Sequence, residues 1–465
     1  MLRLLREANA ATLDAPGGHV SGNVSPRVYS VPFRMPPSSR QLGRAVQVSD
    51  MQEEHDAVQR VRAALSEAGI DGISFKAEIS AHGHAMLWLF TPPPTMEPDI
   101  GFGAAYPGTL VRYEGVLPEP ARRLPEPNPD ARPHPSADPA LLERVLRQRL
   151  PDTAGATEEE LAAAEARLGM QLPDELKALY RTMRSPVEPR EDDWDWDEDD
   201  GGEPDERELT DAMLGELLFS LDGVHIGDAA TRYPSWHLAR EAVITPPGAA
   251  VQQLVGSPGW IVFGDDHGDS RYAIDMTPGP QGNLGQVIAL PVHDRIGARL
   301  EAHSLTDFVQ GRFAQDAARL DEAPVIASVY QGGQPSIEAI AHPDLEVLVI
   351  RKGPKREGEP LGLASLAGLP NLRTLYADPG TLADPLQIAG LATLEYLELG
   401  PQDWRALLDA RAVPDSLLAA QIIVWGNPAP QPQPDPARYV VLANEITALW
   451  NGPQIAETVI DGQLE

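Results

Sequence analysis

A run of prolines divides the chain. Residues 116–139 contain eight prolines in 24 positions. Proline fixes φ and lacks an N–H group, so such a run is extended and fits poorly inside a helix or sheet. We therefore expect a semi-rigid linker over residues 116–139, with folded domains on both sides. A second proline run, residues 428–436, opens the C-terminal segment 427–465. For this segment we expect a strand at 439–442, a helix at 443–450 and a capping role for the repeats.

The N-terminal region has two parts of different character. Residues 1–49 carry six arginines against Glu7 and Asp14 and show no sustained apolar period, which predicts a mostly disordered tail. This tail is either a non-functional extension or an arginine-rich targeting arm. Residues 50–115 show helical apolar spacing followed by strand-like segments at 73–79, 84–90 and 109–113, which predicts a small α+β domain.

Residues 325–426 contain a leucine repeat. The segment 366–375 aligns with 388–397 at an offset of 22 residues, and a weaker copy at 342–348 lies 27 residues before the first. Periods of about 20–29 residues are typical of leucine-rich repeats, in which each unit buries its apolar edge against its neighbours. The spacing predicts a short leucine-rich-repeat-like α/β segment; the alternative is a leucine-rich α/β segment without that geometry.

Residues 140–311 predict a larger α+β domain. Asp138 and Pro139 begin one helix, and the Thr157–Glu160 capping box begins another that Gly169 ends. A helix is also expected at 174–183, and Ser304 caps a last one. Strands are expected at 260–263, 271–274 and 286–290.

Four blocks of this domain carry a family resemblance: residues 156–180, 260–275, 282–287 and 302–308, in that order. The domain resembles the SUKH superfamily (SMI/KNR family), which groups the yeast cell-wall-assembly regulator with bacterial immunity proteins. The resemblance implies a twisted sheet against helices. The fold class expected for the chain is α+β: this SUKH-like sheet, the small N-terminal domain and the short repeat segment.

An acidic stretch interrupts the SUKH-like domain. Residues 191–208 contain twelve acidic residues and one arginine, together with Trp194 and Trp196. One interpretation is an electrostatic lure with aromatic anchors for a basic protein; the other is a solvated, disordered loop. The candidate partner-binding residues are Trp194, Asp195, Trp196, Asp197, Asp199, Asp200, Asp265 and Asp266.

Three groups of residues have the types that metal sites use. Asp195, Asp197 and Asp199 have the spacing of calcium-loop ligands, but Asp200 stands where the sharp turn needs glycine. One group could form a catalytic or metal cluster, or only the turn between two strands, in which aspartate and glycine are common: Asp265, Asp266, His267 and Asp269. His82 and His84 share a strand face without a third ligand. We expect no metal and no cofactor.

Composition narrows the function. There is no cysteine and no recognisable nucleotide-binding, metalloprotease or serine-hydrolase motif, so we expect no enzyme. A net charge of −32 disfavours nucleic acid and anionic membranes and favours a basic protein partner. No apolar run could span a bilayer and no secretory signal is evident, so we expect a cytoplasmic protein. The resemblance implies an immunity protein that neutralises a toxin, possibly a nuclease; the alternative is a regulatory scaffold.

Overall fold

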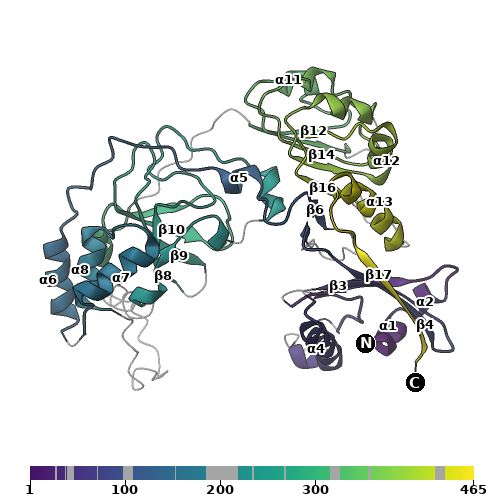
Figure 1. The fold of residues 1–465 in the computed structure, drawn as a ribbon, viewed down its shortest axis with the longest axis horizontal. Helices are drawn as coiled ribbons and strands as arrows, with labels where there is room; N and C mark the ends of the chain where they lie inside the picture. Colours follow the sequence, from purple (N-terminus) through teal and green to yellow (C-terminus); the bar gives the residue numbers. More distant parts are fainter. Residues whose placement is uncertain are drawn as a thin grey trace. The chain divides into compact units, whose positions relative to one another are not determined.

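The computed structural model describes most of the chain. The described residues are 1–26, 29–36, 38, 47–70, 72–97, 108–151, 153–184, 218–232, 235–266, 269–314, 325–353, 358–424 and 435–464. They form two compact units, one from Met1–Val116 with Pro324–Glu465 and the other from Leu117–Ala323 (Figure 1). Both units combine helices with β-sheet, which confirms the expected α+β class.

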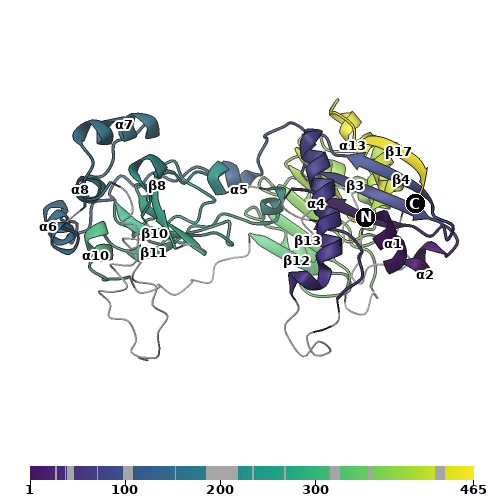
Figure 2. The same ribbon diagram turned by 90° about the horizontal axis from the view of Figure 1, so that it is seen from below.

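The first sheet of the first unit joins the two ends of the chain. Its strand order is β17-β4-β3-β1-β2. The strands are β1 (Val20–Val24), β2 (Tyr29–Ser30), β3 (Ile73–Ile79), β4 (His84–Thr91) and β17 (Ala456–Gln463). The helices α1 (Leu2–Ala8), α2 (Ala10–Leu13) and α4 (Gln52–Glu67), with the 3-10 turn η1 (Val48–Met51), belong to the same part of the chain (Figure 2).

The N-terminal segment therefore differs from the expected disordered tail. Within residues 1–49 the structure places α1, α2, β1 and β2. Leu5, Leu13, Val20 and Val24 are buried against the sheet and its helices. Helices this short carry too few apolar residues to produce a periodic signal, and β1 is fixed by pairing with β3 rather than by its own sequence.

The C-terminal segment also differs in its secondary structure. Residues 439–442, expected as a strand, lie inside helix α13 (Pro436–Leu449). Asp435 caps this helix by accepting the N–H of Ala437 at 3.0 Å, and Pro436 occupies its first turn. Four side chains of α13 are buried in the core of the second sheet: Val440, Leu442, Ala443 and Ile446. This burial outweighs the strand preference of the adjacent β-branched residues Val440 and Val441.

The second sheet of the first unit contains the repeat. Its order is β12-β13-β14-β15-β16-β6-β5, with the first five strands parallel. Its strands are β12 (Ile326–Tyr330), β13 (Val347–Arg351), β14 (Thr374–Ala377), β15 (Tyr396–Leu399), β16 (Ala419–Ile422), β6 (Thr109–Val111) and β5 (Met96–Glu97). Leu348, Leu375 and Leu397 stand in one register across three strands, which is the alignment that the offsets of 27 and 22 predict.

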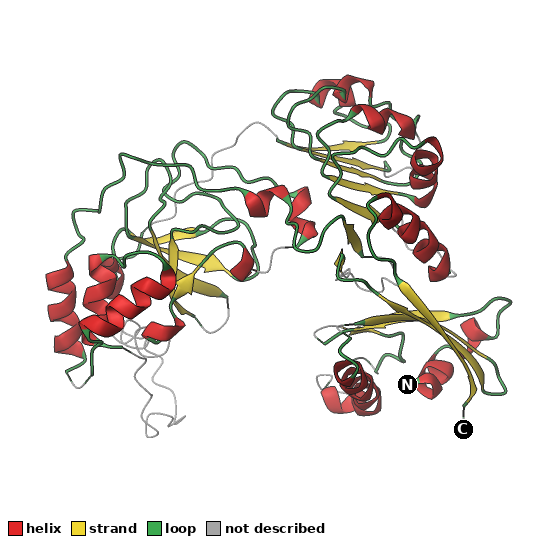
Figure 3. Cartoon of the chain, viewed as in Figure 1, coloured by secondary structure: helices red, strands yellow, loops and turns green. Residues whose placement is uncertain are grey.

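Short helices cover one face of these parallel strands (Figure 3). They are α11 (Ile337–Ile340), η6 (Ala364–Leu366), η7 (Pro385–Gly390) and α12 (Pro401–Ala410), joined by α13. The stacked leucines, Trp404 and the buried side of α13 form one apolar core.

The second unit contains an antiparallel sheet with helices on one face. The strand order is β11-β10-β9-β8-β7. Its strands are β7 (His225–Ile226), β8 (Trp260–Asp265), β9 (Ser270–Asp275), β10 (Gln286–Pro291) and β11 (Arg299–Ala302). The main helices are α6 (Pro139–Arg149), α7 (Glu158–Leu168), α8 (Asp174–Thr182) and α10 (Leu305–Val309). Shorter elements are α5 (Glu119–Arg122), η3 (Leu221–Gly223), η4 (Ala230–Arg232) and η5 (Trp236–Arg240).

The helix starts and ends predicted for this unit from capping residues are confirmed. Asp138 caps α6, and the Thr157–Glu160 box caps α7. Gly169 ends α7 with φ of 72°, a left-handed conformation that glycine adopts without steric cost. Ser304 caps α10, as expected.

The proline-rich segment is not a free linker. Residues 117–138, here called the strap, lie along the second unit and bond to it repeatedly. Arg123 donates to the carbonyl of Val243 at 3.0 Å, and Asn128 donates to that of Gly279 at 2.9 Å. The extended conformation that prolines impose leaves main-chain groups available to bond to a neighbouring surface.

Candidate functional site

The sequence-predicted site is only partly described. Trp194, Asp195, Trp196, Asp197, Asp199 and Asp200 lie outside the described residues, whereas Asp265 ends β8 and Asp266 follows it. The Asp266 carboxylate accepts the N–H groups of Asp269 at 2.8 Å and Ser270 at 2.7 Å. Asp266 therefore forms the turn between β8 and β9, one of the two roles considered from the sequence.

The described residues nearest to the acidic stretch in sequence are Arg184 and Leu218. Arg184 accepts the N–H of Leu221 at 3.0 Å, so the described residues before and after 185–217 are close together. Leu218 forms a β-bridge with Gly264, the residue before Asp265. The structure thus places Leu218 at the same end of β8 as Asp265 and Asp266.

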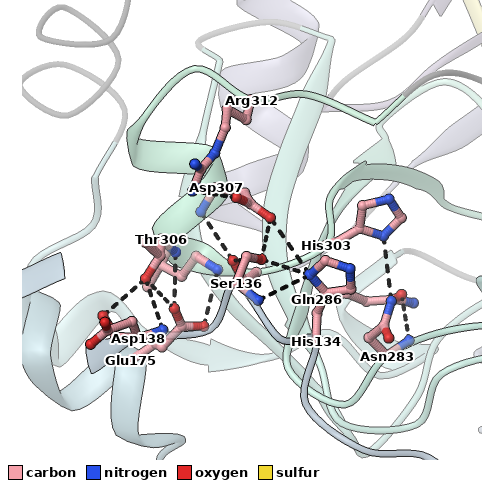
Figure 4. A network of polar contacts seen from close by, with 12 residues as sticks. His134, Ser136, Asp138, Glu175, Asn283, Gln286, His303, Thr306, Asp307 and Arg312 are labelled. Atoms are coloured by element: carbon pink, nitrogen blue, oxygen red, sulfur yellow. Dashed lines mark hydrogen bonds and ion pairs between the residues drawn. The ribbon is translucent and has the colours of Figure 1, made fainter. Parts of the chain in front are cut away.

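A polar network lies where α8, α10 and the strap meet (Figure 4). Glu175 of α8 is buried and accepts the N–H groups of Leu305 at 3.2 Å and Thr306 at 3.0 Å. The Thr306 hydroxyl also donates to Glu175. One carboxylate therefore satisfies two amides of the first turn of α10, which have no partner within the helix.

The strap contributes the other half of the network. Ser136 donates its hydroxyl hydrogen to Asp307 and lies 3.0 Å from the hydroxyl of Ser304. Arg312 forms an ion pair with the same aspartate at 2.6 Å. The His134 ring stacks on His303 with centroids 4.8 Å apart. These contacts fix the end of the strap to α10 and to the end of β11.

Serine, histidine and aspartate meet here in an order that does not suit nucleophilic catalysis. In a hydrolytic triad the imidazole lies between the hydroxyl and the carboxylate, so that it can accept the hydroxyl proton. Here Ser136 lies between them: its Oγ is 2.7 Å from His134 Nδ1, and its hydrogen goes to Asp307. This geometry fits a structural role, in which the hydrogen bonds of Ser136 hold the end of the strap against α10.

A second buried carboxylate lies at the end of β9. Asp275 is fully buried and accepts hydrogen bonds from the Thr277 N–H at 2.8 Å and the Gln286 side-chain amide at 3.0 Å. Burial raises the pKa of Asp275 to about 6, although these hydrogen bonds act in the opposite direction. The sequence places Asp275 at a strand end but gives no sign of this interior role.

A half-buried arginine contacts the loops beside the sheet. Arg232 donates to four carbonyls, those of Val255 at 3.1 Å, Gly297 at 3.0 Å, Pro291 at 2.9 Å and Asp294. Burial lowers the pKa of Arg232 to about 10. Its sequence surroundings have no pattern from which this role could have been predicted.

The described residues give no metal site. They contain no group of three histidine, cysteine or acidic side chains that could hold an ion. His84, one of the paired histidines considered above, instead lies 2.8 Å from Asp461 on the neighbouring strand β17. Among the described residues, no helix is both long and apolar enough to cross a membrane.

Part of the second unit matches a known family. Residues 155–311 match the SMI1 / KNR4 family (SUKH-1). The match confirms the resemblance inferred from the four sequence blocks. The SUKH-1 match begins after the strap and α6, although both pack with the same unit.

A similar protein has a regulatory name. The "Glucan synthesis regulatory protein" of Neurospora crassa is 38% identical over 63 residues, which is 13% of this chain. The match covers 12% of the length of that relative. The similarity therefore concerns a short part of both proteins.

Proposed function

We propose that this chain is a protein-binding module in which the SUKH-1 domain carries the recognition. The observation that carries this proposal is how the polar residues of the matched blocks are used. Glu160 caps a helix, Glu175 satisfies the start of α10, Asp266 forms a turn and Asp275 is buried. Each of them serves the fold, which leaves the domain surface as the functional part.

The proposed partner is a basic protein. Between Leu141 and Gly311 the sequence holds 14 basic and 33 acidic residues. Twelve of these acidic residues lie in 191–208, between Arg184 and Leu218 in the sequence, and Leu218 bridges to Gly264 beside Asp265. Opposite charges accelerate association and select the partner.

Within this role we propose toxin neutralisation as an immunity protein in the cytoplasm. A nuclease is basic where it holds phosphate, so an acidic domain can compete at that surface. The cysteine-free sequence suits a reducing compartment.

The second candidate is a regulatory scaffold that binds several cellular proteins. The glucan synthesis regulatory protein favours this alternative, because its name describes regulation. Both candidates require binding and no chemistry.

The test combines capture with charge reversal. The full chain is used to capture partners from its native host, with identification by mass spectrometry. One secreted toxin supports immunity, several housekeeping proteins support the scaffold, and no partner contradicts both.

The association rate of the captured partner is then measured with the unaltered chain and with a charge-reversal variant. In this variant four residues are changed to lysine: Asp195, Asp197, Asp199 and Asp200. We expect association at low salt to slow at least tenfold and its salt dependence to weaken. The control changes four acidic residues of the other unit, Glu53, Asp56, Glu67 and Asp409, to lysine. An unchanged rate in the first variant would contradict the proposed acidic surface.

A further inference from the structure

Within the described part of the chain, the outer edge of the C-terminal strand β17 pairs with no other strand. This strand is the outermost strand of the sheet β17-β4-β3-β1-β2 and pairs only with β4 among the described strands. All eight of its residues are exposed. At about 3.3 Å per residue, the edge offers about 26 Å of main chain whose outward N–H and C=O groups face solvent.

This edge is regular and firmly held. The eight pairs with β4 run from Ala456–Thr91 to Gln463–His84 without a register shift. Asn444 holds the start of the strand by accepting the Ile455 N–H at 2.8 Å, and the Leu464 N–H donates to Gly83 at 2.8 Å beyond its end. The strand is therefore ordered before any partner arrives.

Other sheet edges in the described chain are shorter. β2, β5 and β7 have two residues each, and β11 has four with an irregular register against β10. β12 has five. Natural proteins usually shorten, bend or cover an edge to prevent pairing with other chains. β17 has neither a bulge nor a proline.

The side chains of β17 define what could pair with it. Val459 and Ile460 are 49% and 48% exposed and point to opposite faces of the sheet. Glu457 and Asp461 flank Val459 on its own face, two residues away on each side. This face of the edge therefore presents acidic, apolar and acidic side chains in turn.

The same pattern opposes self-association. Antiparallel pairing of two copies centred on Val459 would set Glu457 opposite Asp461 twice. Like charges directly opposite each other in a sheet are destabilising. The acidic pair thus disfavours a second copy in this register and favours a strand with basic residues at the corresponding positions.

We propose that β17 binds an extended segment of another protein by strand addition, with basic side chains on both sides of an apolar one. The main-chain bonds of the added strand supply affinity, and Glu457 and Asp461 select its charge. This site lies outside the SUKH-1 match and acts independently of the acidic stretch at 191–208.

The test uses a defined probe, the acetylated and amidated peptide Thr-Lys-Thr-Val-Thr-Lys-Thr with a fluorescent label, which places its two lysines and its valine on one face. Binding to the full chain is measured by anisotropy at low salt. A second probe has the same sequence with methylated backbone amides, and a third has glutamate in place of lysine. We expect the first probe to bind at least tenfold more tightly than either of the others.

Charge variants make the result specific. In Glu457→Lys with Asp461→Lys, the preference should reverse to the glutamate peptide. The control, Asp56→Lys with Glu67→Lys on α4, has the same net charge change and should keep the original preference. Amide exchange of β17 should slow when the first probe binds to the unaltered chain.

Three outcomes would overturn the proposal. Equal binding of the methylated probe would show attraction by charge alone. An unchanged preference in the Glu457 and Asp461 variant would place the probe elsewhere. If sedimentation showed that the unaltered chain forms a dimer through β17, the edge would be assigned to a second copy.

Discussion

Glu175 accepts the main-chain N–H of Thr306 at 3.0 Å, from a helix 131 residues earlier in the chain. The acceptor belongs to α8 and the donor to the first turn of α10. The same carboxylate also accepts the Leu305 N–H and the Thr306 hydroxyl. A single buried side chain therefore joins α8 and α10, near the two ends of the segment that matches the SUKH-1 family.

Replacing this acceptor should destabilise the second unit. In Glu175→Ala two buried amides and a hydroxyl lose their partner, and we expect the free energy of unfolding to fall by about 3 kcal/mol. Glu175→Gln keeps one acceptor oxygen and should lose about 1 kcal/mol. Denaturant unfolding measures both. Glu159→Ala, an exposed acidic residue of α7, is the control and should change stability by less than about 0.5 kcal/mol.

The buried Asp275 predicts a pH dependence of stability. Its pKa in the folded protein is about 6, above the ordinary value of 3.8, so the folded state holds this proton more tightly than the unfolded state. Stability from this group is present below pH 4 and is lost as pH rises towards and through 6, by about 3 kcal/mol in all.

Asp275→Asn should remove that part of the profile. Unfolding free energies of the unaltered chain and the variant are compared at pH 4, 5, 6 and 7. We expect their difference to shift in favour of the variant as pH rises. Parallel profiles would show that Asp275 is ionised throughout this range.

The parts of the fold that could be predicted from the sequence are those in which the interacting residues are close together in the chain or recur at a regular spacing. The Thr157–Glu160 capping box and Gly169 act within one or two helical turns, and the helix start and end that they predict are confirmed. The leucine offsets were equally informative, because stacked parallel strands repeat the same spacing in three dimensions. These features need no knowledge of distant residues.

Features built by distant pairing could not be predicted in this way. β17 pairs with β4 across most of the chain, and nothing in either strand specifies the other. The same holds for the candidate site. The role of Asp266 in its turn was among those considered from the sequence. The roles of Glu175 and Arg232 depend on distant partners and could be recognised only in the structure.

Arg232 should be intolerant of replacement. Arg232→Met keeps much of the side-chain volume but leaves the carbonyls of Val255, Gly297, Pro291 and Asp294 without this donor. We expect a loss of about 3 kcal/mol in the unfolding free energy of the second unit. Arg144→Met, at an exposed arginine of α6, serves as the control and should be nearly neutral. Similar stability of the two variants would contradict the assigned role.

The stacked leucines should behave as one packed core. Leu397 is fully buried, so Leu397→Ala should cost about 2–5 kcal/mol in the first unit. Leu386→Ala, at a leucine that is 43% exposed, should cost far less. Amide exchange followed in both units should show faster opening of β13 to β15 and no change in β8 to β10. An equal effect on both units would mean that they unfold together.

The strap provides the last prediction, because a free linker and a docked strap respond differently to one substitution. Ser136→Ala removes the hydroxyl that contacts His134, Ser304 and Asp307. If residues 117–138 are docked, amide exchange and proteolysis of the strap should accelerate several-fold, and unfolding should cost about 1–2 kcal/mol less. Asp130→Ala, at an exposed strap residue, is the matched control and should leave both unchanged. A Ser136 variant that behaves like this control would show that the proline-rich segment is a linker after all.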